Sequence, residues 1–137
     1  MANRLTKGKA LFGSVTTDGT VKAQLLTQQR AVNNIADGAS MTFTAAHTLA
    51  GIVTATPTTA RNIQAPTGAS VIAALAGETV GDSIEVTIIN LSASAANMTL
   101  TVNTNTTIVG SATIASASSA TFIVRVASSS AVVFYRK

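Results

Sequence analysis

Few side chains of this chain of 137 residues have the chemistry for acid–base or nucleophilic catalysis. There is one histidine, His47, with five carboxylates and no cysteine, although 22 threonines and 13 serines supply many hydroxyl groups. A serine nucleophile would need His47 as its base, but the segment Thr44-Ala-Ala-His-Thr-Leu49 contains no nucleophile elbow or other catalytic signature. We therefore expect no enzymatic activity and no catalytic residue. His47 is expected at the surface or in a turn, and a pH-sensitive contact at a subunit interface is the alternative.

Three of the five acidic residues, Glu78, Asp82 and Glu85, form the only acidic cluster in the sequence. Calcium takes six to eight oxygen ligands, which such loops often supply. However, Gly77-Glu-Thr-Val-Gly-Asp82 lacks the Asp-x-Asp-x-Asp-Gly spacing, and no glycine-rich phosphate loop is present. We therefore predict solvated carboxylates, no metal site and no cofactor.

The net charge of +4 is confined to the start of the chain. Beyond residue 30, four cations and four anions cancel, so we interpret residues 1–36 as a basic N-terminal arm and 37–137 as the body. Such an arm can bind an acidic protein surface or phosphates, or remain a solvated terminus. Nucleic acid is the least favoured partner, because Phe12 is the arm's only aromatic residue. The candidate partner-binding residues are the arm's five cations: Arg4, Lys7, Lys9, Lys22 and Arg30.

The elements that would carry these residues are short strands, and they are clearest in the second half of the chain. Hydrophobic residues there alternate with polar residues in runs rich in threonine and valine, separated by turns. This pattern is typical of an all-β fold, and we predict an antiparallel β-sandwich. The predicted strands are Ile84–Asn90, Met98–Asn103, Thr107–Val109, Ala112–Ile114, Thr121–Val126 and Ala131–Arg136.

The first half of the body gives weaker signals. Met41–Thr44 and Gly51–Ala55 are predicted as strands. Arg61–Ala65 is predicted as an edge strand, because it is bracketed by two prolines, which cannot donate to an interior ladder. Ser70–Ala76 is predicted to form one or two helical turns, ended by Gly77.

Before residue 36 two readings stay open. Leu11–Lys22 has the form of a hairpin, because Asp18-Gly19 suits a type I′ turn. Ala23–Ile35 is either a short helix or part of an extended arm that becomes ordered on a partner.

The composition indicates a subunit of an assembly. Charged residues make up 10% of the chain, against about 25% in typical domains. A surface covered by small hydroxyl groups is poorly protected against self-association. Mean hydropathy is +0.42, but no apolar run reaches the roughly 18 residues that a membrane span requires, and we expect neither a membrane contact nor a signal peptide.

Part of the body resembles known virion proteins of tailed phages. Gly77–Asn90 is similar to a segment in which a short helix and a Val-Gly-Asp turn lead into a strand that ends in Asn. Met98–Val102 with Thr107–Ile114 resembles the paired strands that follow. Ser119–Val126 and Ala131–Arg136 resemble the closing strands. The family is that of capsid decoration (cement) and head-fibre proteins of bacteriophages.

The resemblance implies a jelly-roll-like sandwich that forms a homotrimer. It implies a viral structural protein on the capsid surface, assembled in the host cytoplasm, whose partner is the major capsid protein. Three bodies would associate through apolar and Thr-rich sheet faces, and three arms would lie across capsid subunits. The alternative is a receptor- or glycan-binding tip module of a phage fibre or spike, and a cellular β-sandwich binding module or pilus-like subunit is a further one.

Overall fold

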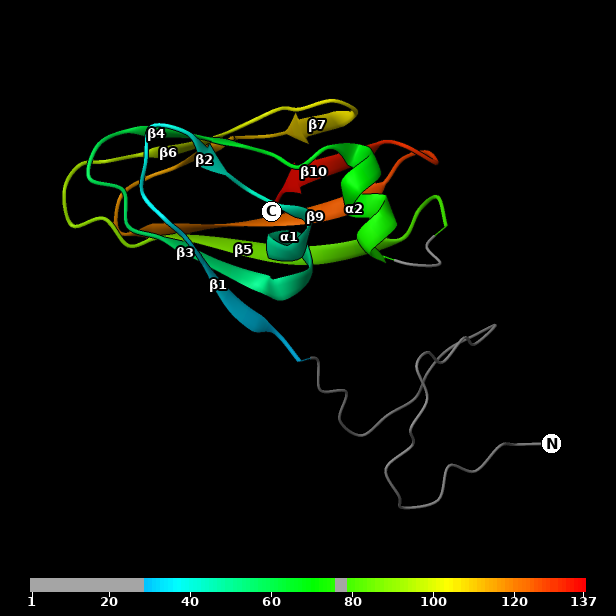
Figure 1. The fold of residues 1–137 in the computed structure, drawn as a ribbon, viewed down its shortest axis with the longest axis horizontal. Helices are drawn as coiled ribbons and strands as arrows, with labels where there is room; N and C mark the ends of the chain where they lie inside the picture. Colours follow the sequence, from blue (N-terminus) through cyan, green and yellow to red (C-terminus); the bar gives the residue numbers. More distant parts are fainter. Residues whose placement is uncertain (1–28, 76–78) are drawn as a thin grey trace, which may run out of the picture.

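The computed structural model describes residues 29–75 and 79–137, which form two β-sheets and two helices (Figure 1). The predicted hairpin at Leu11–Lys22 lies outside the described residues. The larger sheet has six strands, in the spatial order β1 (Ala31–Ile35), β3 (Gly51–Ala55), β5 (Ser83–Asn90), β9 (Ser118–Val126), β10 (Val132–Arg136) and β7 (Thr106–Val109). The smaller sheet has four, in the order β2 (Met41–Thr42), β4 (Arg61–Gln64), β6 (Met98–Thr101) and β8 (Thr113–Ile114).

Successive strands from β1 to β9 belong alternately to the six-stranded and the four-stranded sheet. A chain that crosses to the other sheet after each strand, and then crosses back, returns in its original direction. Each returning strand can therefore pair in parallel with the strand two positions earlier in the chain. This happens for β1 with β3, β3 with β5, β2 with β4 and β4 with β6.

The prediction of an antiparallel arrangement is therefore wrong, although the prediction of a β-rich fold is confirmed. Five of the eight ladders among the described strands are parallel, β7 with β10 being the fifth. The antiparallel ladders join β5 to β9, β9 to β10 and β6 to β8. The sequence pattern could not reveal the parallel pairing. The alternation of hydrophobic and polar residues shows which face of a strand is buried, but it does not show which strand is the neighbour.

The core is built from side chains of both sheets. Phe134 meets Phe43 and Phe122 edge-on, with ring centroids 6.2 and 6.3 Å apart, and all three rings are buried. The four-stranded sheet contributes Ile63 and Leu100 to the same cluster. The predicted alternation in the second half is confirmed, because the hydrophobic residues of one parity in β5, β6, β9 and β10 lie in this core.

A helix that the sequence did not predict, α1 (Ala45–Ala50), follows β2 directly. The predicted strand Met41–Thr44 ends at Thr42, because Thr44 is extended and caps the helix, with its hydroxyl oxygen accepting from the His47 backbone N–H at 3.3 Å. The helix ends at Gly51, whose φ of 82° lies in the left-handed region that glycine adopts without strain.

The predicted helical turns at Ser70–Ala76 correspond to α2 (Gly68–Leu75). Val71 of α2 belongs to the core cluster, and Ala45 of α1 packs against it. Both helices therefore lie on the core side of the six-stranded sheet.

Two further predictions, for β4 and for β1, differ from the structure. β4 lies between β2 and β6, so the prediction of an edge strand at Arg61–Ala65 is wrong. Pro57 and Pro66 lie outside the bounds of β4 and remove no donor from its ladder. Ala31–Ile35 is a strand rather than a helix, and it pairs with β3 along its whole length. The boundary predicted between residues 36 and 37 therefore falls after a strand of the six-stranded sheet.

Candidate interaction surface

The six-stranded sheet has a face that points away from the core, called the outer face below. Its residues can be identified from the pleat of the strands, because the residues next to each buried position point to the opposite side of the sheet. Register places Ile52, Thr87 and Thr121 side by side in one row across β3, β5 and β9. The outer face consists of Ile52, Thr54, Ser83, Glu85, Thr87, Ile89, Ser119, Thr121, Ile123, Arg125, Val133 and Tyr135, with Val32 and Asn34 on β1 and Thr107 and Val109 on β7.

The middle strands of the outer face carry isoleucines and threonines together with an ion pair between Lys137, whose backbone N–H donates to the Thr121 carbonyl oxygen, and Glu85 on β5. Ile52, Ile89 and Ile123 are each half-buried and do not belong to the core cluster. The hydroxyl groups of Thr87 and Thr121 lie 2.9 Å apart and share a hydrogen bond across β5 and β9. The outer side of the four-stranded sheet is different, because its outward residues are threonine, asparagine and glutamine: Thr42, Asn62, Gln64, Thr99, Thr101 and Thr113. The two sheets therefore present unlike surfaces.

The charged residues of the outer face lie on its middle strands, where Glu85 is opposite Ile123 in the ladder between β5 and β9. Glu85 contacts two cations, with its Oε1 3.6 Å from Nη2 of Arg30 and its Oε2 3.0 Å from Nζ of Lys137. The hydrogen bond and the charge of Lys137, with a smaller contribution from Arg30, hold the pKa of Glu85 below its ordinary value. Arg125, in the adjacent register row on β9, makes no hydrogen bond or ion pair within residues 29–75 and 79–137.

Arg30 reaches Glu85 because no side chain stands between them. It precedes β1, and its guanidinium also donates to the carbonyl oxygens of Gly51 and Glu85, at 3.5 and 3.4 Å. A Cβ at Gly51 would lie 3.3 Å from the Cγ and Cδ atoms of Arg30, so glycine leaves the path of the arginine clear.

Of the five predicted partner-binding residues, Arg30 alone belongs to the described part of the chain. It lies at the border of the outer face, in an ion pair with Glu85. Arg4, Lys7, Lys9 and Lys22 lie outside the described residues. Sequence reasoning grouped Arg30 with these cations by position and missed Glu85 as its partner, because Glu85 is 55 residues away in the chain.

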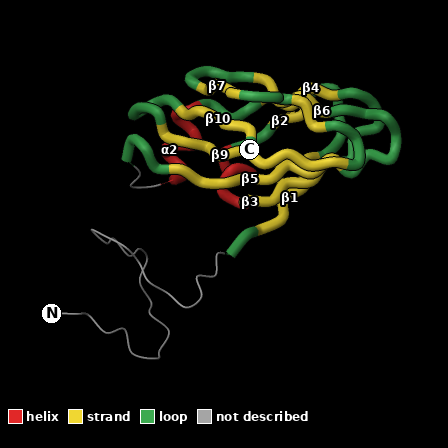
Figure 2. Tube along the Cα trace, turned by 180° about the vertical axis from the view of Figure 1, so that it is seen from behind, coloured by secondary structure: helices red, strands yellow, loops and turns green. Residues whose placement is uncertain are grey.

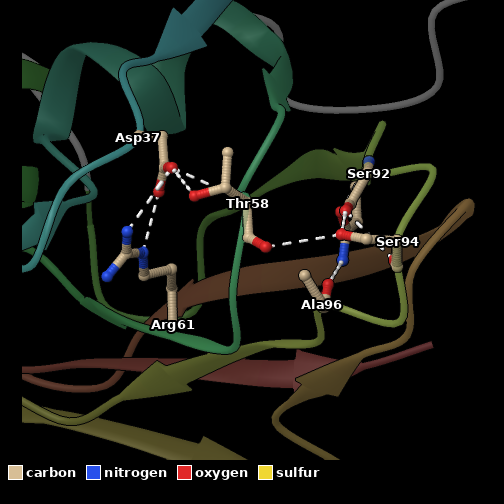
Figure 3. A network of polar contacts seen from close by, with 7 residues as sticks. Asp37, Thr58, Arg61, Ser92, Ser94 and Ala96 are labelled. Atoms are coloured by element: carbon tan, nitrogen blue, oxygen red, sulfur yellow. Dashed lines mark hydrogen bonds and ion pairs between the residues drawn. The ribbon is translucent and has the colours of Figure 1, made fainter.

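A network of polar contacts ties together the loops that carry the chain from one sheet to the other (Figure 3). Asp37 lies between β1 and β2. It accepts hydrogen bonds from Thr58, which lies between β3 and β4, and from Arg61, the first residue of β4. Ser94, between β5 and β6, donates to the Thr58 carbonyl oxygen at 3.4 Å. Asn90, which is fully buried, donates to the carbonyl oxygens of Ala96 and Ile114. This loop network is structural, because its side chains bond to one another.

His47 takes part in helix capping. Its Nδ1 accepts from the Thr44 backbone N–H at 3.0 Å, which completes a capping box with the threonine hydroxyl. The ring lies 5.7 Å from that of buried Phe43. Partial burial lowers the pKa of His47, so the neutral form that this acceptor role needs is favoured.

The predicted acidic cluster does not form a metal site in the described chain. Asp82 accepts hydrogen bonds from Thr79, Glu85 is in ion pairs on β5, and Glu78 lies outside the described residues. No group of three metal-ligating side chains occurs among residues 29–75 and 79–137. A shallow hollow lined by Ile89, Asn90, Leu91 and residues 117–119 contains no titratable group.

No protein-family model, curated protein or solved structure matches this chain. None of the helices in the described residues is long and apolar enough to cross a membrane. The outer face, with Arg30 at its border, is therefore the feature from which a function can be argued.

Proposed function

We propose that this chain is a structural subunit of a virion, a capsid decoration protein that assembles as three copies and stabilises the shell by docking on the major capsid protein. The observation that carries the proposal is the outer face, whose isoleucines and threonines lie outside the core cluster and whose border carries Arg30. The resemblance of Gly77–Arg136 to decoration and head-fibre modules of tailed phages supports it.

In this proposal the body is a β-sandwich, with the two sheets facing each other across the shared core. Its parallel ladders distinguish it from an antiparallel jelly roll. The task of such a protein is mechanical, which is to present a rigid surface. The long ladder between β5 and β9, which pairs eight residues of each strand, gives that surface its stiffness.

The basic residues before β1 are the proposed contacts with the capsid. The segment that carries Arg4, Lys7, Lys9 and Lys22 precedes Arg30 in the sequence, and Arg30 lies at the border of the outer face. Three such segments on one assembly bind more tightly than one, because the second and third contacts are intramolecular. Binding across subunit boundaries would stabilise the intact shell by linkage.

The experiment is sedimentation of the purified protein with emptied heads of the virus that encodes it. We expect saturable binding that weakens with added salt, and decorated heads that resist thermal rupture better than bare heads. A variant with Arg4, Lys7, Lys9 and Lys22 replaced by Gln should bind weakly and lose the salt dependence. An Arg136→Gln variant, which removes a cation of β10, is the control. Equal binding by both variants would contradict the role of the arm, and no binding to heads by any of them would contradict the function.

A further inference from the structure

We infer that the outer face of the six-stranded sheet docks on an acidic surface of a protein partner, through a basic patch formed by Arg30, Arg125 and Lys137 around Glu85. The inference rests on the proposed function and deepens it, because it names a docking surface on the body, in addition to the arm, and the chemistry of the partner.

The basic patch lies on one side of the molecule. Arg30 precedes β1, Glu85 lies on β5, Arg125 lies on β9, and Lys137 directly follows β10. Figure 2 shows β1, β3, β5 and β9 next to one another, with β4 and β6 on the opposite side of the molecule. The patch therefore faces away from the four-stranded sheet.

The net charge of the described chain is concentrated on this patch. Within residues 29–75 and 79–137, the side chains carry five positive and three negative charges, which gives +2. The patch alone carries three positive charges and one negative charge, which also gives +2. The other charged residues of these ranges therefore cancel, and a negatively charged partner is attracted to the outer face rather than to another side of the body.

The charges outside the patch are engaged within the body. Arg61 is paired with Asp37, with Nε and Oδ1 2.8 Å apart. The guanidinium of Arg136 lies 5.5 Å from the ring centroid of Phe122 and donates to two backbone carbonyl oxygens. Asp82 accepts hydrogen bonds from a neighbouring threonine. These groups contribute to the fold and leave the patch as the charged surface open to a partner.

Arg125 is the cation of the patch that the body leaves without a partner. It makes no hydrogen bond or ion pair with residues 29–75 and 79–137. It lies two residues beyond Ile123, which is opposite Glu85, and such diagonal neighbours are about 7–8 Å apart. A guanidinium presents a planar fork of donors that can form two parallel hydrogen bonds to one carboxylate. A carboxylate of the partner can therefore bind Arg125 without breaking a contact of the body.

Glu85 holds the other two cations of the patch in place. Its Oε1 lies 3.6 Å from Arg30 and its Oε2 lies 3.0 Å from Lys137. One carboxylate is thus shared by two cations, and a positive charge remains beside it. The side chain of Lys137 is still 63% exposed, so its ammonium group can donate to a second acceptor. Cations that are already held in place lose less conformational freedom when a partner binds.

The surroundings of the patch favour a protein as the partner. Tyr135 is the only aromatic residue among the outer-face positions of the described chain, so the bases of a single-stranded nucleic acid have few platforms for stacking. Three cations around a carboxylate are also too few for the continuous row of phosphates of a duplex. A folded protein instead presents separate carboxylates between polar and aliphatic atoms. Lys137 lies beside Thr121, four residues along β9 from Arg125, so two such carboxylates would lie roughly 13 Å apart.

The first test uses short poly-L-glutamate as an acidic probe, titrated by fluorescence anisotropy at about 50 mM salt. The protein is the full chain with Arg4, Lys7, Lys9 and Lys22 replaced by Gln, so that the probe reports on the body. Arg125→Gln and Lys137→Gln should each weaken binding about 3-fold, as expected for exposed ion pairs. Glu85→Gln should strengthen binding about 3-fold, because a repelling carboxylate is lost. Arg136→Gln removes the same charge outside the patch and is the matched control, which should leave binding nearly unchanged.

The opposite signs of these effects separate a binding surface from a loss of folding. A damaged protein binds less, whichever charge was removed, so tighter binding by Glu85→Gln has no such explanation. Urea unfolding measured by circular dichroism verifies that each variant is folded. The inference would be overturned by a folded protein that does not bind the probe, by patch variants that bind like their parent, or by weaker binding of Glu85→Gln. Tighter binding of an oligodeoxynucleotide of the same charge would also overturn it, because the partner would then be a nucleic acid.

The second test repeats the sedimentation with emptied heads, using the patch variants with the native arm. Weaker binding by Arg125→Gln and tighter binding by Glu85→Gln would support both the inference and the proposed function. Binding to heads that depends on the arm but not on the patch would overturn the inference and leave the function in place. The expected pattern with poly-L-glutamate, without binding to heads, would support the inference and contradict the function.

Discussion

Oδ1 of Asp37 lies 2.8 Å from Nε of Arg61, and this ion pair joins two loops that are more than 20 residues apart in the chain. The same carboxylate accepts from the backbone N–H of Thr58 at 3.1 Å and from its hydroxyl at 2.7 Å. Because the strands wind in parallel from sheet to sheet, the loops after β1, β3 and β5 meet at the same end of the molecule. Asp37 thus fastens the first of these loops to the second, and Thr58 connects the second to the third through Ser94.

Asp37→Asn should destabilise the fold. The amide keeps the shape of the side chain but loses the charge, and it weakens the hydrogen bonds from Arg61 and Thr58. We expect a lower urea midpoint with an unchanged slope, measured by circular dichroism. Asp82→Asn removes a carboxylate outside this network and serves as the control. Equal midpoints for Asp37→Asn and wild type would show that the ion pair contributes no stability.

Acid should destabilise the protein through the same kind of contact. The cations and hydrogen bonds around Asp37 and Glu85 hold the pKa of both carboxyls below their ordinary values. Both contributions are therefore complete above the ordinary pKa of about 4, and they are lost as the pH falls below it through the lower folded values. The urea midpoint should fall between about pH 4 and pH 2. The double variant Asp37→Asn, Glu85→Gln should show a flatter profile, and a profile as steep as wild type would contradict this assignment.

His47 should make stability depend on pH in a higher range. Its neutral Nδ1 accepts from Thr44, and its pKa is lowered by burial, so the contribution is complete above the ordinary pKa of about 6.5 and is lost as the pH falls through the folded value. His47→Gln keeps an acceptor suited to this capping position without a titratable group. Its stability should stay constant between about pH 7 and pH 5, where that of wild type declines. Thr44→Ala should cost about 1 kcal/mol at either pH.

Gly68 should tolerate no side chain. A Cβ there would collide with the backbone carbonyl oxygens of Asn105 and Ser130, which cannot move without shifting their loops. We expect Gly68→Ala to cost about 1–3 kcal/mol of unfolding free energy, as overpacking does. Gly38→Ala is the control, because nothing lies within 4 Å of a Cβ at that position. Urea unfolding of the two variants measures the difference, and similar midpoints would contradict the close approach.

The sequence predicted where most strands lie but not how they pair. The runs around Val86, Leu100 and Val124 alternate cleanly, because each strand has one face in the core and one outside. The parallel ladders were missed because they result from the path of the chain between strands. The two prolines beside β4 gave a false edge signal, because proline restricts only the strand that contains it.

The candidate surface was harder to predict than the strands. The charge distribution indicated Arg30, but its position at the border of a sheet depends on the turn at Gly51 and on Glu85 across the fold. Helix α1 had a local signal that was overlooked: a threonine at position 44, a hydrogen-bonding side chain three residues later at His47, and a glycine at position 51 just after the last helical residue.

The position of β9 between β5 and β10 has a consequence for biosynthesis. While the chain emerges from the ribosome, strands β1 to β6 can already pair within the two sheets. One edge of β5, however, has no partner until residues 118–126 have been made. An eight-residue strand with free N–H and C=O groups is a template for pairing with another nascent chain. Ribosomes that stall before this point would release polypeptides prone to aggregation, and rapid synthesis of residues 118–126 would protect the newly made protein.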